Sequence, residues 1–412
     1  MKLILTICLS LSATCWLFAQ TTPKVDTTDL LGILRKMLKP SASGPGKHST
    51  IALLPALGYN PSIGFQMGLN VSGGMYFGNK DSNILSIFTV SAFVTTKQIA
   101  TGQLRHNIFI HNNEWNFQGN WQVSRIATLD YGEGTGITKG TRGHFSINDL
   151  PLENDSAVFP IKFTYYRFTE RAYRTIAPHW YAGAGLSLDI RNNIDDQKLD
   201  SPAMTPHSRY SQANGFNPKH YSANGLLFDI LYNTKEHPNR SYGGMYADAG
   251  LRINQQWLGS TKNSFQLLTE FRKYWSLSNK NPEHVLAVWA WGSFLLAGSI
   301  PYLELPGTAS DVYNRSGRGY TSGRFKGLSF FCEETEYRFP ITRNKLMSGA
   351  VFMNLQTGSN QQGSSLFEYW EPAAGAGLRF LFNRYTRTNL CIDFALGRYG
   401  SKGIFFGLNE VF

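Results

Sequence analysis

The chain has 412 residues, of which 14% are aromatic, 16% are charged and 40 are glycine. Its formal net charge is +11 at pH 7, but the lysines and arginines are spread singly among polar and aromatic residues, which excludes the dense basic patch of a nucleic-acid-binding protein. Of the four cysteines, Cys332 and Cys391 lie outside the first 20 residues; they could form one disulfide bridge but cannot stabilise a chain of this length. The near absence of amphipathic helical segments argues against a soluble enzyme.

Residues 1–20 have the features of a secretory signal peptide. Lys2 precedes an apolar stretch over residues 3–17, and residues 18–20 offer a cleavage site. Because the apolar stretch is shorter than the roughly 20 residues that a spanning helix needs, we expect cleavage rather than a retained membrane anchor. A lipoprotein signal at Cys15 fits less well, because no leucine stands three positions before it.

Residues 21–48 are expected to form a short periplasmic helix and a linker. The helix is predicted over Thr28–Lys39, with Asp29 near its start and a proline directly after its end. The apolar residues that share one face of it are Leu30, Leu31, Leu34, Met37 and Leu38. The helix either packs against the rim of the following domain or enters its pore as a plug. Glycine, proline and serine in residues 40–48 predict the linker.

From residue 49 onward, apolar and polar residues alternate with a period of two. The pattern is clearest in residues 63–72, 115–124, 245–254 and 265–276. Successive side chains of a β-strand point to opposite faces, so each segment is predicted to be a strand with one apolar and one polar face.

A soluble β-sandwich also alternates, but two features favour a transmembrane antiparallel β-barrel over residues 49–412. The segments are often about 12 residues or longer, which suits a tilted strand that crosses roughly 25 Å of hydrocarbon. Short and long connections also alternate. The short ones are 78–83, 111–114, 176–179 and 341–345, and the long ones are 131–156 and 192–224. We expect about 16 strands, an even number that returns both termini to the periplasmic side.

The uncharged stretch Val285–Leu303 also has the length and composition of a membrane-spanning helix. Its Trp, Val and Phe content, the Gly292-Ser293 pair and Pro301 near its end favour a strand instead. A lone helix beside a row of strands would leave an unpaired sheet edge in lipid, which is costly. We therefore expect a strand.

The segment Asn314–Ile341 carries the motifs that point to a family. Arg318-Gly319-Tyr320 is followed by a second basic cluster around Arg324, and the next strand ends in Glu336-Tyr337-Arg338-Phe339-Pro340. This combination resembles the BamA/TamA family of outer-membrane assembly barrels, also called the bacterial surface antigen family. In that family an Arg-Gly-aromatic motif lies on a long loop that folds back inside a sixteen-strand barrel. Phe228–Gly244 and Ala374–Phe412 are also similar to segments of the family, so the resemblance covers most of the chain after residue 50.

Two features depart from the family's pattern. Many members place an aspartate on the strand that follows, where this chain has Asn354. Residues 21–48 are too few for one of the periplasmic POTRA domains that receive client chains in typical members. The resemblance therefore implies a form that lacks POTRA domains, for which independent protein insertion is in doubt.

The charged residues of this segment predict a contact inside the barrel. Glu334, Glu336 and Arg338 share one parity of the strand, so they are expected to face the lumen. A guanidinium of Arg318 that reaches Glu336 or Glu334 would form a charge-assisted contact of roughly 1–3 kcal/mol, enough to bias the position of the loop. Asn354 can accept a hydrogen bond but cannot neutralise Arg318. The alternative is an external loop with solvated arginines.

The last residues resemble the closing strand by which such barrels are recognised for insertion. Phe412 has the same parity as Ile404, Phe406 and Leu408. Glu410 occupies a position that is usually apolar, so the signal is imperfect. An ordinary last strand is the alternative, and it is compatible with the signal.

No catalytic, cofactor or metal signature accompanies these motifs. The nine histidines are scattered, His106 and His111 lack the spacing of a metal site, and no nucleophile elbow, phosphate loop or Cys-x-x-Cys pair occurs. We expect no enzyme activity, no metal and no cofactor. A lumen serine–histidine lipase and a surface ligand site on residues 192–224 are alternatives that the sequence disfavours.

The expected function follows from the resemblance. It implies an exported outer-membrane protein that aids the assembly or transport of outer-membrane components. Its expected partners are outer-membrane lipid, nascent outer-membrane proteins and a separate periplasmic subunit, and nucleic acid is not among them. A passive or gated pore and a structural or binding surface barrel are the alternatives.

Overall fold

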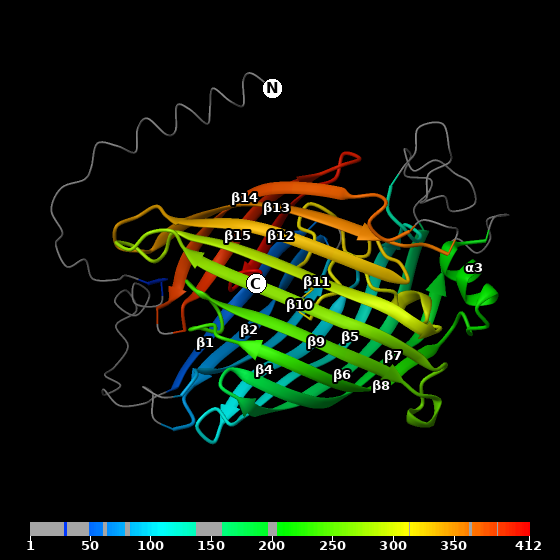
Figure 1. Ribbon diagram of the computed structural model, residues 1–412. Helices are drawn as coiled ribbons and strands as arrows, with labels where there is room; N and C mark the ends of the chain where they lie inside the picture. Colours follow the sequence, from blue (N-terminus) through cyan, green and yellow to red (C-terminus); the bar gives the residue numbers. More distant parts are fainter. Residues whose placement is uncertain are drawn as a thin grey trace.

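The computed structural model describes residues 29–30, 49–60, 64–78, 83–136, 159–196, 204–312, 314–361, 365–384 and 386–412. Within these residues sixteen strands form one antiparallel sheet (Figure 1). Each strand pairs with its neighbours in the sequence, so the sheet order is β1 to β16 without a crossover. The expected all-β class and antiparallel arrangement are confirmed. The predicted signal peptide and the helix over residues 28–39 lie outside the described residues, except for Asp29 and Leu30.

Most strands are long enough to cross a membrane. Their bounds are β1 Ser49–Asn60, β2 Gly64–Met75, β3 Ser86–Thr95, β4 Ala100–Ile110, β5 Trp115–Asp130, β6 Phe159–Ala177, β7 Trp180–Asp196, β8 Tyr221–Asn233, β9 Gly244–Asn254, β10 Ser264–Ser276, β11 Val285–Gly298, β12 Ser329–Pro340, β13 Met347–Gly358, β14 Glu371–Asn383, β15 Thr388–Gly397 and β16 Lys402–Leu408. At about 3.3 Å per residue and a tilt of about 40°, ten residues span about 25 Å along the membrane normal. The connections contain α3 Pro206–Ala213, η3 Gln256–Leu258 and η4 Tyr302–Glu304.

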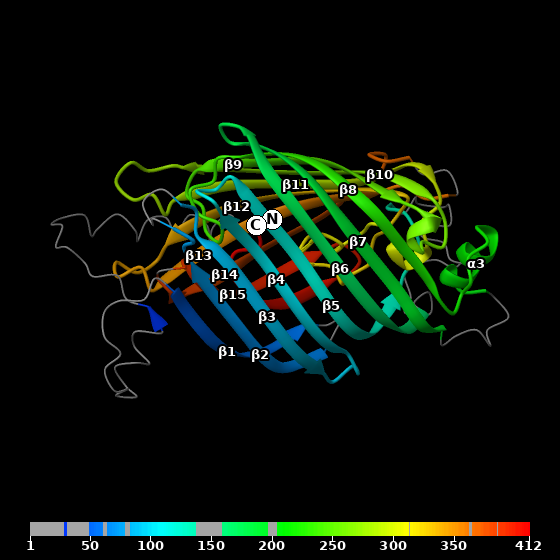
Figure 2. The ribbon, with the colours of Figure 1, turned by 90° about the horizontal axis from the view of Figure 1, so that it is seen from below.

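The sheet bends round until β1 and β16 come into contact (Figures 1 and 2). Among the described strands, hydrogen-bonded ladders join every sequential pair, but no ladder joins β1 to β16. We call the concave side of the sheet the lumen. The end at which β1 begins is the turn end. The opposite end, which carries the described residues 131–136, 204–220 and 299–312 and residues 314–328, is the loop end.

The convex face carries a belt of exposed apolar side chains from alternating strand positions. They include Phe65, Met67, Leu69, Val90, Val94, Trp121, Val123, Tyr166, Phe168, Phe228, Ile230, Leu251, Phe265, Phe271, Val351, Met353, Leu378, Phe394, Leu396, Ile404 and Phe406. A continuous apolar surface of this extent is rare on a protein that is surrounded by water. The period of two in the sequence therefore separates this belt from a polar lumen face.

The lumen face carries paired charges. On β6 and β7, Arg167 Nε lies 2.7 Å from Asp189 Oδ1, and Arg252 of β9 reaches the other oxygen of Asp189 at 2.9 Å. Arg171 lies 3.2 Å from Asp229 of β8. These ion pairs join side chains of different strands, so the charged residues of the lumen face form one connected set across the wall.

The uncharged stretch expected as a strand is β11, so that prediction is confirmed. Val285, Ala287, Trp289 and Trp291 point into the lumen and are buried, and β11 pairs with both β10 and β12. The inward residues are apolar because they pack against the loop that follows and against Phe412. Both faces of this strand are therefore apolar, which explains its resemblance to a spanning helix.

The connections differ from the prediction in two places. β7 continues to Asp196, so the loop expected over 192–224 is shorter, and it contains α3. Polar residues occupy both faces at the end of β7, so the sequence shows no alternation there from which the strand could be predicted. The loop end also carries the short connections 96–99 and 398–401, so short and long connections alternate only in part.

One polar cluster interrupts the apolar belt on β4, β5 and β6. His106 Nε2 lies 3.2 Å from Glu170 Oε2, and Trp121 Nε1 donates a hydrogen bond to the same oxygen at 3.0 Å. Gly119 lies between His106 and Glu170 in the two ladders, and a side chain there would overlap both of them. The glycine therefore lets the two ionisable groups meet across the middle strand.

Candidate functional site

The connection between β11 and β12, residues 299–328, folds into the lumen, and we call it the lumen loop (Figure 1). Tyr302 and Phe325 are fully buried. Thr308 Oγ1 donates a hydrogen bond to Gln356 Oε1 of β13 at 2.7 Å, and Tyr320 OH donates one to the Pro372 carbonyl of β14 at 2.6 Å. The loop therefore lies against the inner face of the strands that follow it.

A second set of contacts holds the loop to the opposite wall. Lys326 Nζ donates to Asp130 Oδ1 at 2.8 Å, and Tyr302 OH donates to the same oxygen at 2.9 Å. The Gly134 amide donates to the Lys326 carbonyl at 2.7 Å. Asp130 ends β5, so the loop crosses the lumen between β5 and β13.

The backbone on either side of Arg318 requires glycine. Gly317 and Gly319 have φ values of 75° and 106°. A Cβ at Gly317 would lie 2.6 Å from Gln356 Oε1, and one at Gly319 would lie 2.8 Å from the Ala373 Cβ. Glycine adopts this conformation without strain and leaves room for the wall. The loop can therefore lie close enough to β13 and β14 for Arg318 to reach their neighbours.

The structure brings Arg318 together with both carboxylates proposed from the sequence and with a third. Arg318 Nη2 donates to Glu334 Oε1 at 2.5 Å and to Glu336 Oε2 at 2.6 Å. Arg318 Nη1 donates to Asp393 Oδ2 of β15 at 2.8 Å. The guanidinium lies 3.4 Å from the centre of the Phe352 ring and is 3% exposed. Three carboxylates and an aromatic face thus hold one buried cation.

Asn354 contacts the backbone of the motif rather than its charge. Its Nδ2 donates to the Arg318 carbonyl at 2.8 Å. It occupies the position at which many family members are expected to have aspartate, and in this chain Asp393 supplies an acid to Arg318 from another strand. The Asn354 amide therefore positions the loop backbone, while carboxylates of β12 and β15 neutralise the charge of Arg318.

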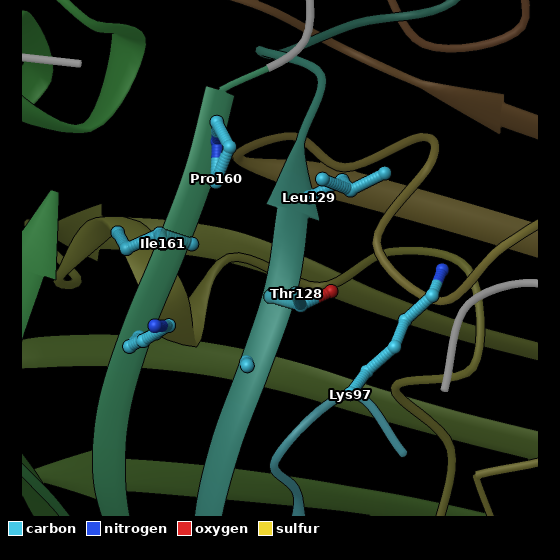
Figure 3. A pocket seen from close by; sticks show the side chains of 7 residues that line it. Lys97, Thr128, Leu129, Pro160 and Ile161 are labelled. Carbon is cyan, nitrogen blue, oxygen red and sulfur yellow. The ribbon is translucent and has the colours of Figure 1, made fainter. Parts of the chain in front are cut away.

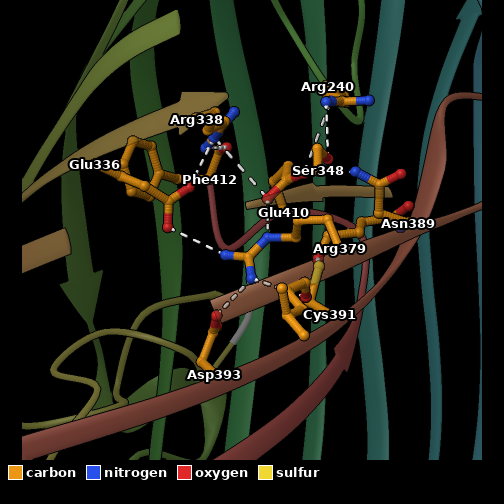
Figure 4. A network of polar contacts seen from close by, with 12 residues as sticks. Arg240, Glu336, Arg338, Ser348, Arg379, Asn389, Cys391, Asp393, Glu410 and Phe412 are labelled. Atoms are coloured by element: carbon orange, nitrogen blue, oxygen red, sulfur yellow. Dashed lines mark hydrogen bonds and ion pairs between the residues drawn. The ribbon is translucent and has the colours of Figure 1, made fainter. Parts of the chain in front are cut away.

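A second arginine extends this network toward the end of the chain (Figure 4). Arg379 of β14 donates to Asp393 Oδ1 at 2.5 Å and to Glu336 Oε2 at 3.3 Å. Its Nε donates to Glu410 Oε2 at 2.8 Å, and Asn389 Nδ2 donates to the other oxygen of Glu410 at 2.7 Å. Arg379 therefore joins the carboxylates that hold the lumen loop to the residues that follow β16.

Phe412 lies beyond the last strand, although its parity with Ile404, Phe406 and Leu408 suggested a place on it. β16 ends at Leu408, and Asn409 has a φ of 67°, which turns the chain into the lumen. Phe412 is buried against Trp289 with the ring centres 5.3 Å apart. Glu410, which weakened the signal in the sequence, points inward to Arg379. The alternation of inward and outward side chains ends at Asn409, so it does not predict the direction of Phe412.

The lumen loop also holds these last residues directly. Arg315 donates from Nη2 to the Leu408 carbonyl at 2.6 Å. Its Nη1 donates to the carbonyls of Asn409 and Glu410 at 3.3 and 2.7 Å. Arg338 of β12 donates to the Phe412 oxygen at 3.0 Å. One side chain of the loop thus satisfies three successive carbonyls that a longer β16 would offer to a neighbouring strand.

The network is almost dry, and this raises the importance of each contact in it. The side chains of Arg318, Arg338, Arg379, Glu336 and Glu410 are each at most 3% exposed. Removal of one partner from a buried ion pair costs about 3–5 kcal/mol, because the other charge stays buried without compensation. The lumen loop and residues 409–412 share these charges, so neither can move without a change in the contacts of the other.

Tyr320 and Arg324 of the predicted motif lie apart from this network. The Tyr320 hydroxyl accepts a hydrogen bond from the Arg398 amide at 2.9 Å, and burial raises the pKa of Tyr320 to about 12. The Arg324 guanidinium lies 4.4 Å from the Tyr131 ring centre and 5.7 Å from that of Tyr399. These two residues hold the loop to the rim, whereas Arg318 and Arg315 hold it to the inner wall.

Within the described part of the chain, no three histidine, cysteine or acidic side chains are grouped so that they could bind a metal ion. In the same residues, none of the helices has the length and apolar character needed to cross a bilayer. The chemistry of the site, as far as it is described, is therefore that of arginine, carboxylate and aromatic contacts.

No protein-family model matches this sequence, and no curated protein is significantly similar to it. Solved structures match the fold. BamA from Haemophilus ducreyi lacking POTRA domains 1–3 superimposes with a TM-score of 0.52 at 14% identity, over 88% of this chain and 69% of that chain. CdiB from Acinetobacter baumannii has a TM-score of 0.50 at 9% identity, over 88% of this chain and 65% of that chain. CdiB from Escherichia coli has a TM-score of 0.50 at 8% identity, over 89% of this chain and 63% of that chain. The chain therefore has a BamA-like and CdiB-like barrel fold and spans about two thirds of the length of these proteins.

Proposed function

We propose that this chain is an outer-membrane β-barrel that passes or assembles outer-membrane components, with the lumen loop and residues 409–412 as its gate. The apolar belt and the strand lengths support a position in a membrane. The similarity to BamA and CdiB barrels supports a role in assembly or transport rather than one in metabolism.

The observation that carries the proposal is the shared network of Arg318 and Arg379. Arg318 links the lumen loop to β12 and β15, and Arg379 links two of the same carboxylates, Glu336 and Asp393, to Glu410. A gate needs two elements that move together between discrete states, and shared buried charges couple them. A plug that only filled space would not need charged links to the last strand.

The seam between β1 and β16 supports a route through the wall. β16 has 7 residues and β1 has 12, and no ladder joins the two in the described part of the sheet. Arg315 binds the carbonyls of Leu408 and Glu410, which keeps them from extending β16. Release of Arg315 would free backbone groups on one side of the seam, and such groups are a template for pairing with an incoming strand.

A gated pore is the second candidate. The lumen wall on β6 to β9 carries the cross-strand pairs of Arg167, Arg171 and Arg252 with Asp189 and Asp229. A polar wall of this kind suits the passage of small solutes. In this case the same network would control conductance without any protein client.

Site-specific photocrosslinking in living cells tests the first candidate. A photoreactive residue at Ile404 or Phe406 of β16 faces outward next to the seam, and the same residue at Leu251 of β9 faces outward away from it. We expect nascent outer-membrane proteins, or a separate periplasmic subunit, to be captured at β16 and not at β9. Equal capture at the two strands, or no capture at the seam, would contradict an assembly role. A steady conductance of the purified protein without capture would favour the pore.

A further inference from the structure

A step in the wall lies at the loop end of β5 and β6. β4 begins at Ala100, which pairs with Arg125, whereas β5 continues to Asp130 and stays paired with β6 to its end. The hairpin between β3 and β4 therefore stops short of its neighbours. A recess of about 170 Å³ lies at this step, lined by Lys97 of the hairpin and by the ends of β5 and β6 (Figure 3).

The recess combines an apolar floor with basic edges. Ala127, Leu129 and Pro160 contribute apolar atoms, and Lys97 and Lys162 flank them. Lys162 pairs with Ala127 across the ladder and faces outward. Residues diagonal to each other on one face of a sheet lie within reach of long side chains. This combination suits a molecule with an apolar part and an anionic head.

Arg125 adds a third cation on the same outward face. It is exposed and precedes Ala127 by two positions, so the two side chains point the same way. Asp195 of β7 lies opposite Lys162 in the next ladder and is the acidic residue nearest to this group in register. Among the described residues around the recess, three side chains are therefore basic and one is acidic.

The height of this group matches the edge of the hydrocarbon. Trp115 begins β5 at the turn end, and Arg125 lies ten positions later on the same face. At about 3.3 Å per residue and a tilt of about 40°, that distance is about 25 Å along the normal, which equals the height of the apolar band of an outer-membrane barrel. Trp115 then lies at one interface and Arg125 at the other. The belt directly below Arg125 includes Val123, which is 57% exposed.

We propose that this recess binds the phosphate head group of an acylated membrane lipid. The phosphate oxygens accept hydrogen bonds from Lys97, Arg125 and Lys162, and the acyl chains lie down the belt over Val123 and Trp121. Arginine and lysine at the border of the apolar belt extend their charged ends toward head groups while their stems stay in the apolar layer. The exposed belt below the recess favours a lipid over a free phosphate ion.

Native mass spectrometry of the purified full chain in detergent micelles tests this proposal. The probes are dimyristoyl phosphatidic acid, dimyristoyl phosphatidylcholine with the same acyl chains, and inorganic phosphate. The variant carries Lys97→Gln, Arg125→Gln and Lys162→Gln. The matched control carries Arg174→Gln at the turn end of β6, Lys273→Gln on β10 and Lys402→Gln on β16, which remove three cations from the outward face away from the recess. All six changes are on the outer surface, so both variants are expected to fold.

The expected result is selective retention of phosphatidic acid by the native chain and by the control. Retention of phosphatidic acid by the variant is expected to be at least about 10-fold lower, because three groups that attract an anionic head group are removed together. Equal retention of the two lipids by the native chain, an equal loss in the control, or competition by millimolar inorganic phosphate would overturn the lipid site. The measurement does not use the seam, so a failure of the crosslinking experiment and a failure of this one are separate results.

Discussion

Replacement of Arg318 by alanine is the sharpest test of the gate. The change removes the guanidinium that contacts Glu334, Glu336 and Asp393, while Arg379 still contacts Glu336 and Asp393. Loss of one member of a buried ion-pair network costs about 3–5 kcal/mol, and we expect the lower end of that range because Arg379 remains. About 3 kcal/mol changes the ratio of closed to open states by about 150-fold.

Planar bilayer recording of the purified protein measures this change. We expect the native chain to be closed for most of the time and Arg318→Ala to open frequently. Arg324→Ala is the matched control, because Arg324 lies on the same loop but contacts Tyr131 and Tyr399 instead of the carboxylates. A closed Arg318→Ala protein, or equal opening in both variants, would refute the reasoning.

Removal of the stranded carboxylate distinguishes a charge effect from a loss of packing. In Arg318→Ala the Glu334 carboxylate stays buried without its cation, whereas Glu336 and Asp393 keep Arg379. We expect the double variant Arg318→Ala, Glu334→Gln to recover part of the lost thermal stability and to return toward the closed state. If it is less stable than Arg318→Ala, the packing of the Arg318 side chain on Phe352 contributes more than its charge.

Three further predictions concern other parts of the molecule. Glu170→Leu removes the carboxylate that His106 and Trp121 contact and should lower stability by about 1–2 kcal/mol, whereas the double change with His106→Leu should recover part of that loss; an additive double-mutant cycle would refute the pairing. Burial, together with the cations Arg387, Lys235 and Arg240, lowers the pKa of His237 to about 3. Because the folded state resists protonation, stability should fall as pH drops below about 6.5, by about 2 kcal/mol at pH 5 in urea unfolding, and His237→Asn should remove this slope. Phe412→Ala should cost about 3–5 kcal/mol through lost packing on Trp289, whereas Phe406→Ala on the outward face should cost under about 1 kcal/mol, and equal losses would place Phe412 outside the lumen.

The strands were predictable because each one encodes its own two faces. The belt residues of β2 and β5, such as Phe65, Met67 and Val123, occur at every second position, and their exposure in the structure follows that order. β11 was harder, since its inward residues are as apolar as its outward ones, and the composition decided in favour of a strand. Local sequence patterns are therefore enough to predict a strand when each of its faces has the same environment, lipid or lumen, along its whole length.

The partners of Arg318 were predictable only in part. Glu334 and Glu336 lie on the strand directly after the loop, so parity and proximity in the sequence were enough to propose them. Asp393 lies 75 residues from Arg318, and its contact depends on how β12 and β15 curve toward each other across the lumen. A single sequence carries no signal for that distance, although Arg379 and Asp393 do stand as charges at inward positions in the apolar middle of their strands.

The last four residues show the limit of parity. The alternation of β16 predicts that Phe412 faces outward, but a single residue with positive φ, Asn409, ends the register. Glu410 was the available warning, because a carboxylate at an outward position would face lipid. A charged residue in the wrong place near a strand end can therefore indicate a turn rather than an imperfect strand.

The inward course of residues 409–412 has a practical consequence for handling the protein. An affinity tag or fluorescent fusion joined after Phe412 starts beside Trp289 and Arg338, inside the cavity. Such a fusion either withdraws these residues from their sites or threads its linker past the lumen loop. Purification through a tag at this position would therefore enrich molecules with the segment displaced, and functional assays on them would describe an altered resting state.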